Sequence, residues 1–169
     1  LWFHNTEPKD FDFQNQALFN AVRIGLHTDA RAIFGKRNDY NEMLQVHAPP
    51  CIDQVFVAAL NRRAPHPYPE HLDPKTIFLL RAAYHGTYLA ALKRQSTTLY
   101  LTLVGGGSFC NPMSLIAQAI ADAHMHWALH PTARHLKRVI LVLYSIGGNM
   151  EFISNLKNIF NLQYPLIKI

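Results

Sequence analysis

The strongest constraint on the fold is an alternation, in the second half of the sequence, of short apolar runs with segments of helical periodicity. The apolar runs are rich in β-branched and aromatic residues and lie at 55–60, 97–104 and 138–144. Such runs predict strands that are buried on both faces. Helical spacing of apolar residues predicts helices over 73–93, from 111 to Pro131, and over 150–160. This alternation predicts an α/β fold with three layers (α/β/α), in which helices cover a mixed, largely parallel sheet.

The first half of the sequence has weaker signals. Leu18, Val22 and Leu26 recur at helical spacing and predict a helix over 14–34, which Gly35 would end. Residues 1–14 predict a short strand and a loop, and Met43 to His47 a second short strand. Four prolines between 62 and 74 predict a surface connection, after which Asp73 and Pro74 would begin the next helix.

The composition is that of one folded domain spanning residues 1–169. Hydrophobic residues make up 49% of the chain and charged residues 16%, which is enough apolar material for a full core. No apolar run reaches the roughly 18 residues of a membrane-spanning helix, and no signal peptide is visible. We therefore expect no membrane partner. The two cysteines form no disulfide framework, so we expect a reducing, cytoplasmic compartment.

The net charge of +5 favours anionic partners. However, the Lys and Arg residues are scattered and are not interleaved with aromatic residues, so nucleic-acid binding is the weaker hypothesis. Ten histidines raise the question of a metal. His126 and His130 are four residues apart, but zinc needs three or four converging ligands and no glutamate stands between them. We therefore expect no metal and no cofactor. The oligomeric state is unknown from the sequence.

The densest functional signal is the segment Leu101-Thr-Leu-Val-Gly-Gly-Gly-Ser-Phe-Cys-Asn-Pro112. A predicted strand runs into three glycines, and a predicted helix begins directly afterwards. Glycine lets backbone amides approach a ligand closely, and a helix start adds free N–H groups with a positive partial charge. These features are typical of a phosphate or diphosphate site. A glycine turn required only for tight packing is the alternative at this stage.

Four segments, in order, resemble parts of the macrodomain family. They are Gln54 to Asn61, Phe78-Leu-Leu-Arg-Ala-Ala-Tyr84, Gly105-Gly-Gly-Ser-Phe-Cys-Asn-Pro112 and the strand Val139 to Tyr144. The resemblance spans about residues 43–160 and is stronger to a divergent branch that includes a secreted bacterial effector hydrolysing ADP-ribosyl-arginine. It implies binding of ADP-ribose or an ADP-ribosylated protein. For a bacterial effector, it also implies delivery into a host cytosol.

The resemblance also implies site residues. Those expected to contact the ligand are Gly105, Gly106, Gly107, Ser108, Phe109, Cys110 and Asn111, with Tyr144 beside the adenine. The sequence departs from the family at Cys110, where glycine is usual, and at Asn111, where phenylalanine is frequent. Residues 1–42 hold no Asn-Ala-Ala-Asn element and no early glycine run, so the family's first ligand loop is missing or remodelled there.

Hydrolysis of an ADP-ribosyl bond builds positive charge at the anomeric carbon, so a carboxylate is expected nearby. The candidates are Asp10, Asp12, Asp29 and Asp53, among which Asp12 and Asp53 are the predicted catalytic residues. An ordinary capping or solvated aspartate is the alternative for each. The functional hypotheses are therefore an ADP-ribosyl-protein hydrolase, a non-catalytic ADP-ribose reader and, less favoured, a nucleic-acid-binding domain.

Overall fold

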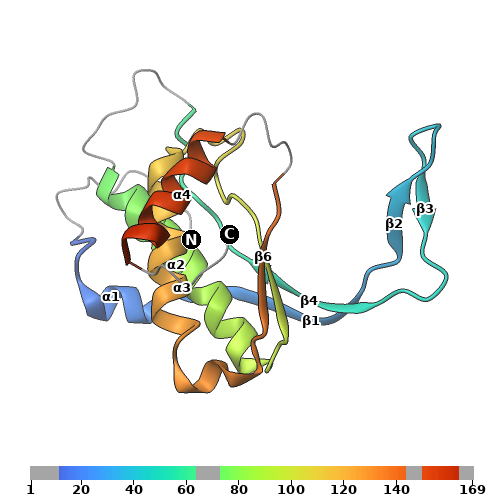
Figure 1. Ribbon diagram of the computed structural model, residues 1–169, viewed down its shortest axis with the longest axis horizontal. Helices are drawn as coiled ribbons and strands as arrows, with labels where there is room; N and C mark the ends of the chain where they lie inside the picture. The colour runs from blue at the N-terminus through green and yellow to red at the C-terminus, as the bar shows by residue number, and fades with distance from the viewer. Residues whose placement is uncertain (1–11, 64–72, 144–149, 164–169) are drawn as a thin grey trace. The chain divides into compact units, whose positions relative to one another are not determined.

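The computed structural model describes residues 12–63, 73–143 and 150–163 (Figure 1). The chain divides into two compact units, one from residues 1–23 and 57–169 and one from residues 24–56. The larger unit contains the main hydrophobic core and the glycine loop. The expected single domain over 1–169 stays a prediction.

The larger unit alternates helices and strands as predicted. Its elements are α1 (Gln16–Ala21), α2 (Asp73–Lys93), β5 (Thr98–Leu101), α3 (Met113–Trp127), the 3-10 helix η3 (Pro131–His135), β6 (Arg138–Leu141) and α4 (Met150–Gln163). Strands β5 and β6 pair in parallel, with Thr98 opposite Arg138 and Leu101 opposite Leu141. The helix α3 forms the crossover between these strands, which is the arrangement expected of an α/β fold.

The core of the larger unit lies where three helices pack against the parallel strand pair. Its largest fully buried side chains include Leu80, Tyr84 and Tyr88 of α2, Ile116 of α3 and Phe152 of α4. Burying one such apolar side chain contributes about 1.5–3 kcal/mol relative to leaving it in water. The helical periodicity that predicted these helices therefore corresponds to the faces that they bury.

The two parallel strands are shorter and less buried than predicted. β5 ends at Leu101 and not at Val104, and within it Leu99 and Leu101 are buried while Tyr100 is 62% exposed. The prediction that the 97–104 run is buried on both faces is therefore wrong, because the core covers only one face of β5. β6 begins at Arg138 as predicted and ends at Leu141.

The predicted helix over 14–34 is also wrong beyond residue 21. Asn15 caps the short helix α1 by accepting hydrogen bonds from the backbone N–H groups of Ala17 and Leu18. Val22 then adopts an extended conformation, and residues 25–31 form a strand. The helical spacing of Leu18, Val22 and Leu26 did not determine the structure here, because the backbone of residues 25–31 makes its hydrogen bonds by pairing with another strand.

The smaller unit consists of two antiparallel strand pairs. β1 (Gly25–Arg31) pairs with β4 (Cys51–Phe56), and β2 (Phe34–Arg37) pairs with β3 (Met43–Gln45). β3 confirms the short strand predicted at Met43. The predicted buried strand over 55–60 is wrong, since β4 ends at Phe56, which is 60% exposed. A two-stranded ribbon covers neither of its faces, so its apolar residues stay accessible.

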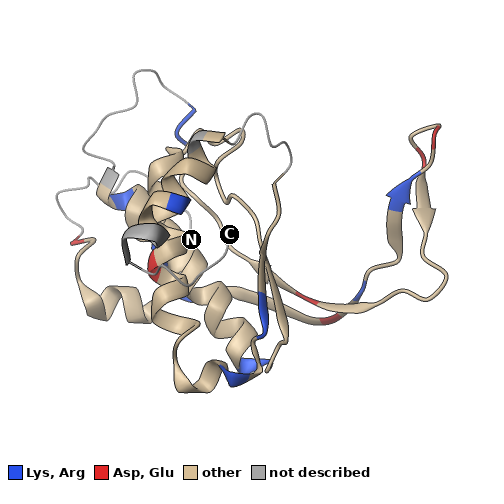
Figure 2. Ribbon diagram, viewed as in Figure 1, with Lys and Arg blue, Asp and Glu red and all other residues tan. Residues whose placement is uncertain are grey.

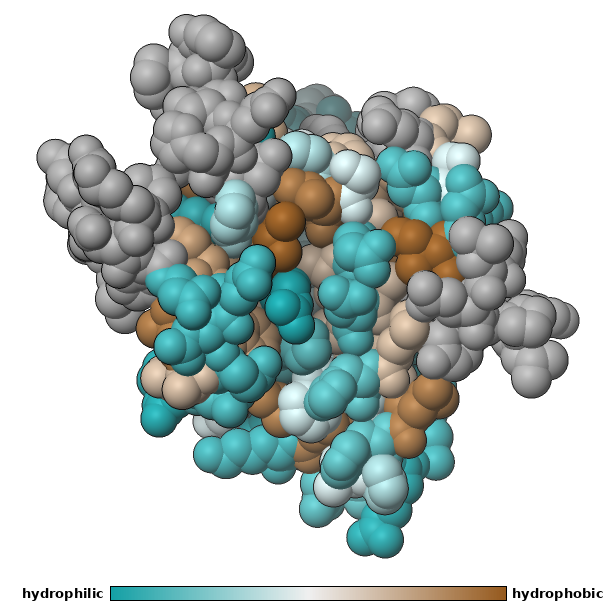
Figure 3. Space-filling model, turned by 90° about the vertical axis from the view of Figure 1, so that its left-hand side faces the viewer, coloured by the Kyte–Doolittle hydropathy of each residue, from teal (hydrophilic) through white to brown (hydrophobic). Residues whose placement is uncertain are grey.

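The surface of the larger unit is mixed in polarity and charge. Figure 2 shows the described Lys and Arg residues on separate elements and not along one stripe. Where the described residues are visible in Figure 3, hydrophobic side chains form small patches among hydrophilic ones. Among the described helices, none is both long and apolar enough to cross a bilayer.

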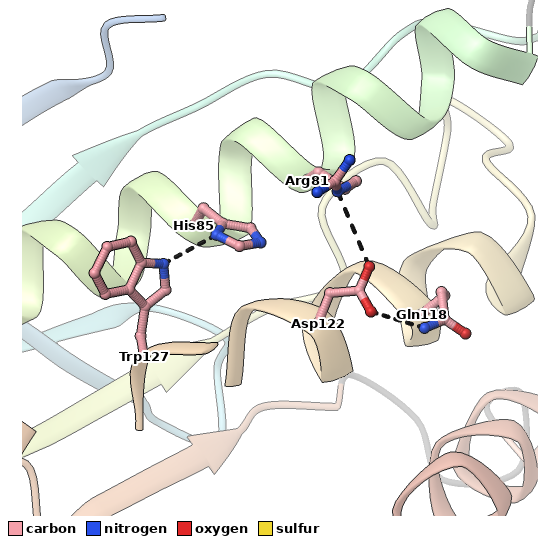
Figure 4. Close-up of polar contacts among 5 residues, drawn as sticks. All are labelled: Arg81, His85, Gln118, Asp122 and Trp127. Atoms are coloured by element: carbon pink, nitrogen blue, oxygen red, sulfur yellow. Dashed lines mark hydrogen bonds and ion pairs between the residues drawn. The ribbon is translucent and has the colours of Figure 1, made fainter. Parts of the chain in front are cut away.

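A polar cluster lies between α2 and α3 (Figure 4). Trp127 donates its indole N–H to Nδ1 of the buried His85 at 3.0 Å, which leaves the ring proton on Nε2. Arg81 Nε lies 4.0 Å from Asp122 Oδ2, and Gln118 donates to the other oxygen of Asp122. Burial lowers the pKa of His85 from 6.5 to about 4, with smaller effects of the same sign from Arg81 and His126, opposed by Asp122.

We predict that acid destabilises the protein in part through His85. Below pH 6.5 the unfolded chain binds a proton at this histidine, whereas the folded chain does not until about pH 4. The contribution of neutral His85 to the free energy of unfolding is therefore fully present above pH 6.5 and decreases as the pH falls to about 4. The variant His85→Asn keeps an acceptor for Trp127, and its free energy of unfolding, measured in urea, should depend less on pH in this range. The exposed His47→Asn is the control, and an equal flattening in both variants would contradict the assignment.

Candidate functional site

The glycine loop, residues 104–112, begins where a buried tyrosine ends β5. The hydroxyl of Tyr84 donates to the carbonyl of Thr102 at 2.9 Å and accepts from the N–H of Val104 at 3.0 Å. Burial raises the pKa of Tyr84, so its hydroxyl stays neutral and can do both at once. The N–H of Val104 also donates to the carbonyl of Thr102 at 3.0 Å, so the Tyr84 hydroxyl adds a second hydrogen bond to each of these two backbone groups just after β5 ends.

Within the loop, backbone hydrogen bonds form tight turns. Gly106 N–H donates to Leu103 at 3.0 Å, Cys110 N–H to Gly107 at 2.9 Å, and Asn111 N–H to Gly105 at 3.0 Å. Two residues have positive φ, Gly105 at 78° and Cys110 at 53°. This conformation favours glycine, so the cysteine at position 110 is accommodated at some conformational cost.

The loop carries backbone donors that no part of the described chain uses. Among the described residues, the N–H groups of Gly105, Gly107, Ser108 and Phe109 have no acceptor. The helix α3 begins directly afterwards, and Pro112 at its N-cap supplies no side-chain hydrogen bond. Free N–H groups beside the positive end of a 15-residue helix suit an anion.

The predicted ligand residues divide into exposed and buried groups. Ser108 and Cys110 are exposed, and the Phe109 side chain is 41% exposed. Asn111 is 3% exposed, and its Nδ2 donates to the carbonyls of Leu60, Gly105 and Phe109. Tyr144, the predicted adenine contact, lies outside the described residues.

Both predicted catalytic aspartates are exposed and take part in local hydrogen bonds. Asp12 Oδ1 accepts from the N–H of Gln14 at 2.9 Å, just before α1 in the larger unit. Asp53, on β4 of the smaller unit, accepts from the N–H of Asp29 at 2.9 Å. Asp10 lies outside the described residues. A catalytic role for Asp12 or Asp53 stays a prediction.

Histidines in the described part take part in packing and capping. The His126 ring lies 4.6 Å from that of Trp127, centroid to centroid, and His130 Nδ1 pairs with the hydroxyl of Thr132 at the start of η3. Within the residues that the structure describes, no three His, Cys, Asp or Glu side chains are grouped to hold a metal.

Two features of the loop were not found from the sequence. The sequence placed Tyr84 in the predicted helix over 73–93 and in a segment that resembles the macrodomain family, and nothing in its spacing indicates a hydroxyl that bonds the backbone at the end of a strand. The segment after β4 was assigned to a strand, whereas the N–H of Arg62 donates to the carbonyl of Phe109 at 2.8 Å. Contacts between residues so far apart in the sequence leave no periodic pattern.

The chain is similar in fold to solved structures of one enzyme. No protein-family model and no curated protein matches the sequence. Among solved structures, it is similar to poly(ADP-ribose) glycohydrolase from Deinococcus radiodurans in complex with ADP-ribose, with a TM-score of 0.58 and 16% identity over 82% of this chain and 52% of that one. The apo form of that protein gives a TM-score of 0.57 and 16% identity over 82% of this chain and 53% of that one.

The chain has a macrodomain-like α/β fold. This confirms the α/β, macrodomain-like fold that the sequence predicted. The described strands form three separate pairs, of which β5–β6 is parallel and the other two are antiparallel, so one largely parallel sheet is not seen among them. The chain spans about half the length of the glycohydrolase structures that it resembles.

We predict that Gly105 and Gly107 differ sharply in their tolerance of a side chain. A Cβ atom at Gly105 would lie 2.5 Å from Asn111 Nδ2 and 2.6 Å from the Ala59 Cβ, and φ is 78°. Gly105→Ala should therefore lower the free energy of unfolding by about 1–3 kcal/mol. Gly107→Ala is the matched control, because a Cβ there has no atom within 4 Å. Equal free energies of unfolding for the two variants in urea would contradict the loop geometry.

Proposed function

We propose that this protein binds ADP-ribose, with the diphosphate held by the backbone amides of the glycine loop. The observation that carries the proposal is the group of unused N–H donors at Gly105, Gly107, Ser108 and Phe109, next to the uncapped start of α3. A diphosphate offers several acceptor oxygens and negative charge, which matches such donors. The similarity of the fold to a glycohydrolase that was solved with ADP-ribose supports the same ligand class.

In this arrangement the exposed loop residues face the ligand. The Ser108 hydroxyl adds a donor beside the amides, and the partly exposed Phe109 ring offers an apolar surface to the distal ribose. Gly106 and Gly107 keep the loop narrow enough for the phosphates to reach the backbone. Tyr144 is the proposed neighbour of the adenine.

We further propose that the protein removes ADP-ribose from modified side chains of other proteins, arginine included. In that reaction the bond between the anomeric carbon and the side-chain atom breaks, and water adds to the carbon. A carboxylate stabilises the developing positive charge or takes a proton from the attacking water. Asp12 and Asp53 are the proposed residues for this step.

A non-catalytic reader of ADP-ribose is the second candidate. The observation that favours it is that residues 104–112 contain no Asp or Glu, so the loop itself supplies no carboxylate for hydrolysis. A reader would bind ADP-ribosylated proteins through the same amides and release them unchanged. Binding and turnover assays on one preparation separate the two candidates.

We predict that filling the space beside Gly107 blocks the ligand without unfolding the protein. ADP-ribose should raise the melting temperature of the wild type, because a ligand that binds only the native state stabilises it. Gly107→Leu should keep the free energy of unfolding and weaken ADP-ribose binding at least about tenfold in titration calorimetry. Binding by Gly107→Leu as tight as by the wild type would exclude the loop as the ligand site.

A separate prediction concerns catalysis. Asp12→Asn and Asp53→Asn keep an oxygen that accepts the observed backbone hydrogen bonds but remove the negative charge. One of the two should slow release of ADP-ribose from an arginine-modified protein by about 100-fold or more, while ADP-ribose affinity stays near that of the wild type. The exposed Asp39→Asn serves as the control. Hydrolysis at the wild-type rate in both variants would exclude both aspartates.

A further inference from the structure

The amide of Asn111 is the least exposed polar group of the glycine loop. Its side chain is 3% exposed, although its neighbours Phe109 and Cys110 are exposed. Nδ2 lies 2.8 Å from the carbonyl oxygen of Leu60, 3.1 Å from that of Gly105 and 3.4 Å from that of Phe109. The amide therefore faces the protein interior and not the space in front of the loop.

The chemistry of these contacts requires an amide in one orientation. Three carbonyl oxygens surround Nδ2, and carbonyls accept hydrogen bonds, so the N–H₂ end of the amide must point at them. The Oδ1 atom is buried and has no donor among the described residues. A carboxylate has the same shape but would place negative charge against three acceptors.

The three carbonyls belong to parts of the chain that must be held together for the loop to keep its form. Gly105 opens the loop, Phe109 lies near its end, and Leu60 belongs to the segment that passes beside it. The backbone N–H of Asn111 also donates to Gly105, and the N–H of Arg62 donates to Phe109. The absence of a Cβ at Gly105 leaves the room that Nδ2 occupies.

We propose that Asn111 is a positioning residue, which holds the stretch from Gly105 to Phe109, with its four free amides, in place for a diphosphate without contacting the ligand. Both ends of the amide-bearing stretch are bonded to one rigid, buried side chain. A preformed set of donors binds an anion more tightly than a mobile one, because less conformational entropy is lost on binding. The ligand in this inference rests on the proposed function, whereas the effect on the loop does not.

The test uses two variants and one matched control. Asn111→Asp keeps the shape but cannot donate to the three carbonyls, and Asn111→Ser keeps a single donor. Asn158→Asp makes the same change at an exposed position of α4. Amide hydrogen exchange should become at least about tenfold faster in both Asn111 variants at Gly106 and Cys110, whose N–H groups are hydrogen-bonded within the loop, while exchange within α3 stays within about twofold of the wild type. ADP-ribose affinity, measured where every variant is folded, should fall at least about tenfold, because binding must then also order the loosened loop.

The outcomes separate the two proposals. The positioning role would be overturned if hydrogen exchange in the loop did not change, since Asn111 would then not hold the loop. It would also be overturned if exchange accelerated equally in the loop and in α3, or if neither Asn111 variant folded, since Asn111 would then support the whole structure and not the loop in particular. Wild-type affinity in variants with a mobile loop would overturn it as well. If the wild type binds no ADP-ribose, the proposed function fails. If exchange in the Asn111 variants still accelerates in the loop alone, the role of Asn111 in positioning the amides stands.

Discussion

The structure depends on how the backbone leaves β5 without exposing unpaired groups to the core. A parallel strand that ends beneath two packed helices must find partners for its last N–H and C=O groups. The Tyr84 hydroxyl, which projects from α2, provides one donor and one acceptor at that place, to Thr102 and Val104. Because α2 carries this hydroxyl, the position of the glycine loop is linked to a helix that also buries Leu80 and Tyr88 in the core.

Beyond that tyrosine, the loop combines inward and outward hydrogen bonding. Carbonyl groups of Gly105 and Phe109 turn toward the protein and are bonded by Asn111 and Arg62. Four N–H groups of the same short stretch remain without acceptors in the described chain. The result is a surface of donors whose acceptor partners must come from solvent or a ligand. In the proposed function, the diphosphate of ADP-ribose supplies those acceptors.

The sequence predicted some parts of this molecule well, for identifiable reasons. Helices over 73–93, 113–127 and 150–163 bury a regular apolar face, so their periodicity reports their packing. Three glycines between a predicted strand and a predicted helix start correctly indicated a loop at residues 105–107. The sequence misled at 14–34, where residues 25–31 form a strand of the ribbon, and at 55–60, where the strand ends at Phe56 and the chain passes on to the larger unit. The roles of Tyr84 and Asn111 were not predictable, because each depends on carbonyl groups brought close by the tertiary fold.

The smaller unit begins and ends on paired strands, with Gly25 directly opposite Phe56. A segment whose first and last residues are neighbours can grow, shrink or be exchanged without changing the distance that the rest of the chain must span. Residues 24–56 thus have a hydrogen-bond ladder of their own. Changes in the length or in the exposed side chains of this ribbon should therefore leave the hydrogen bonds within the glycine loop as they are.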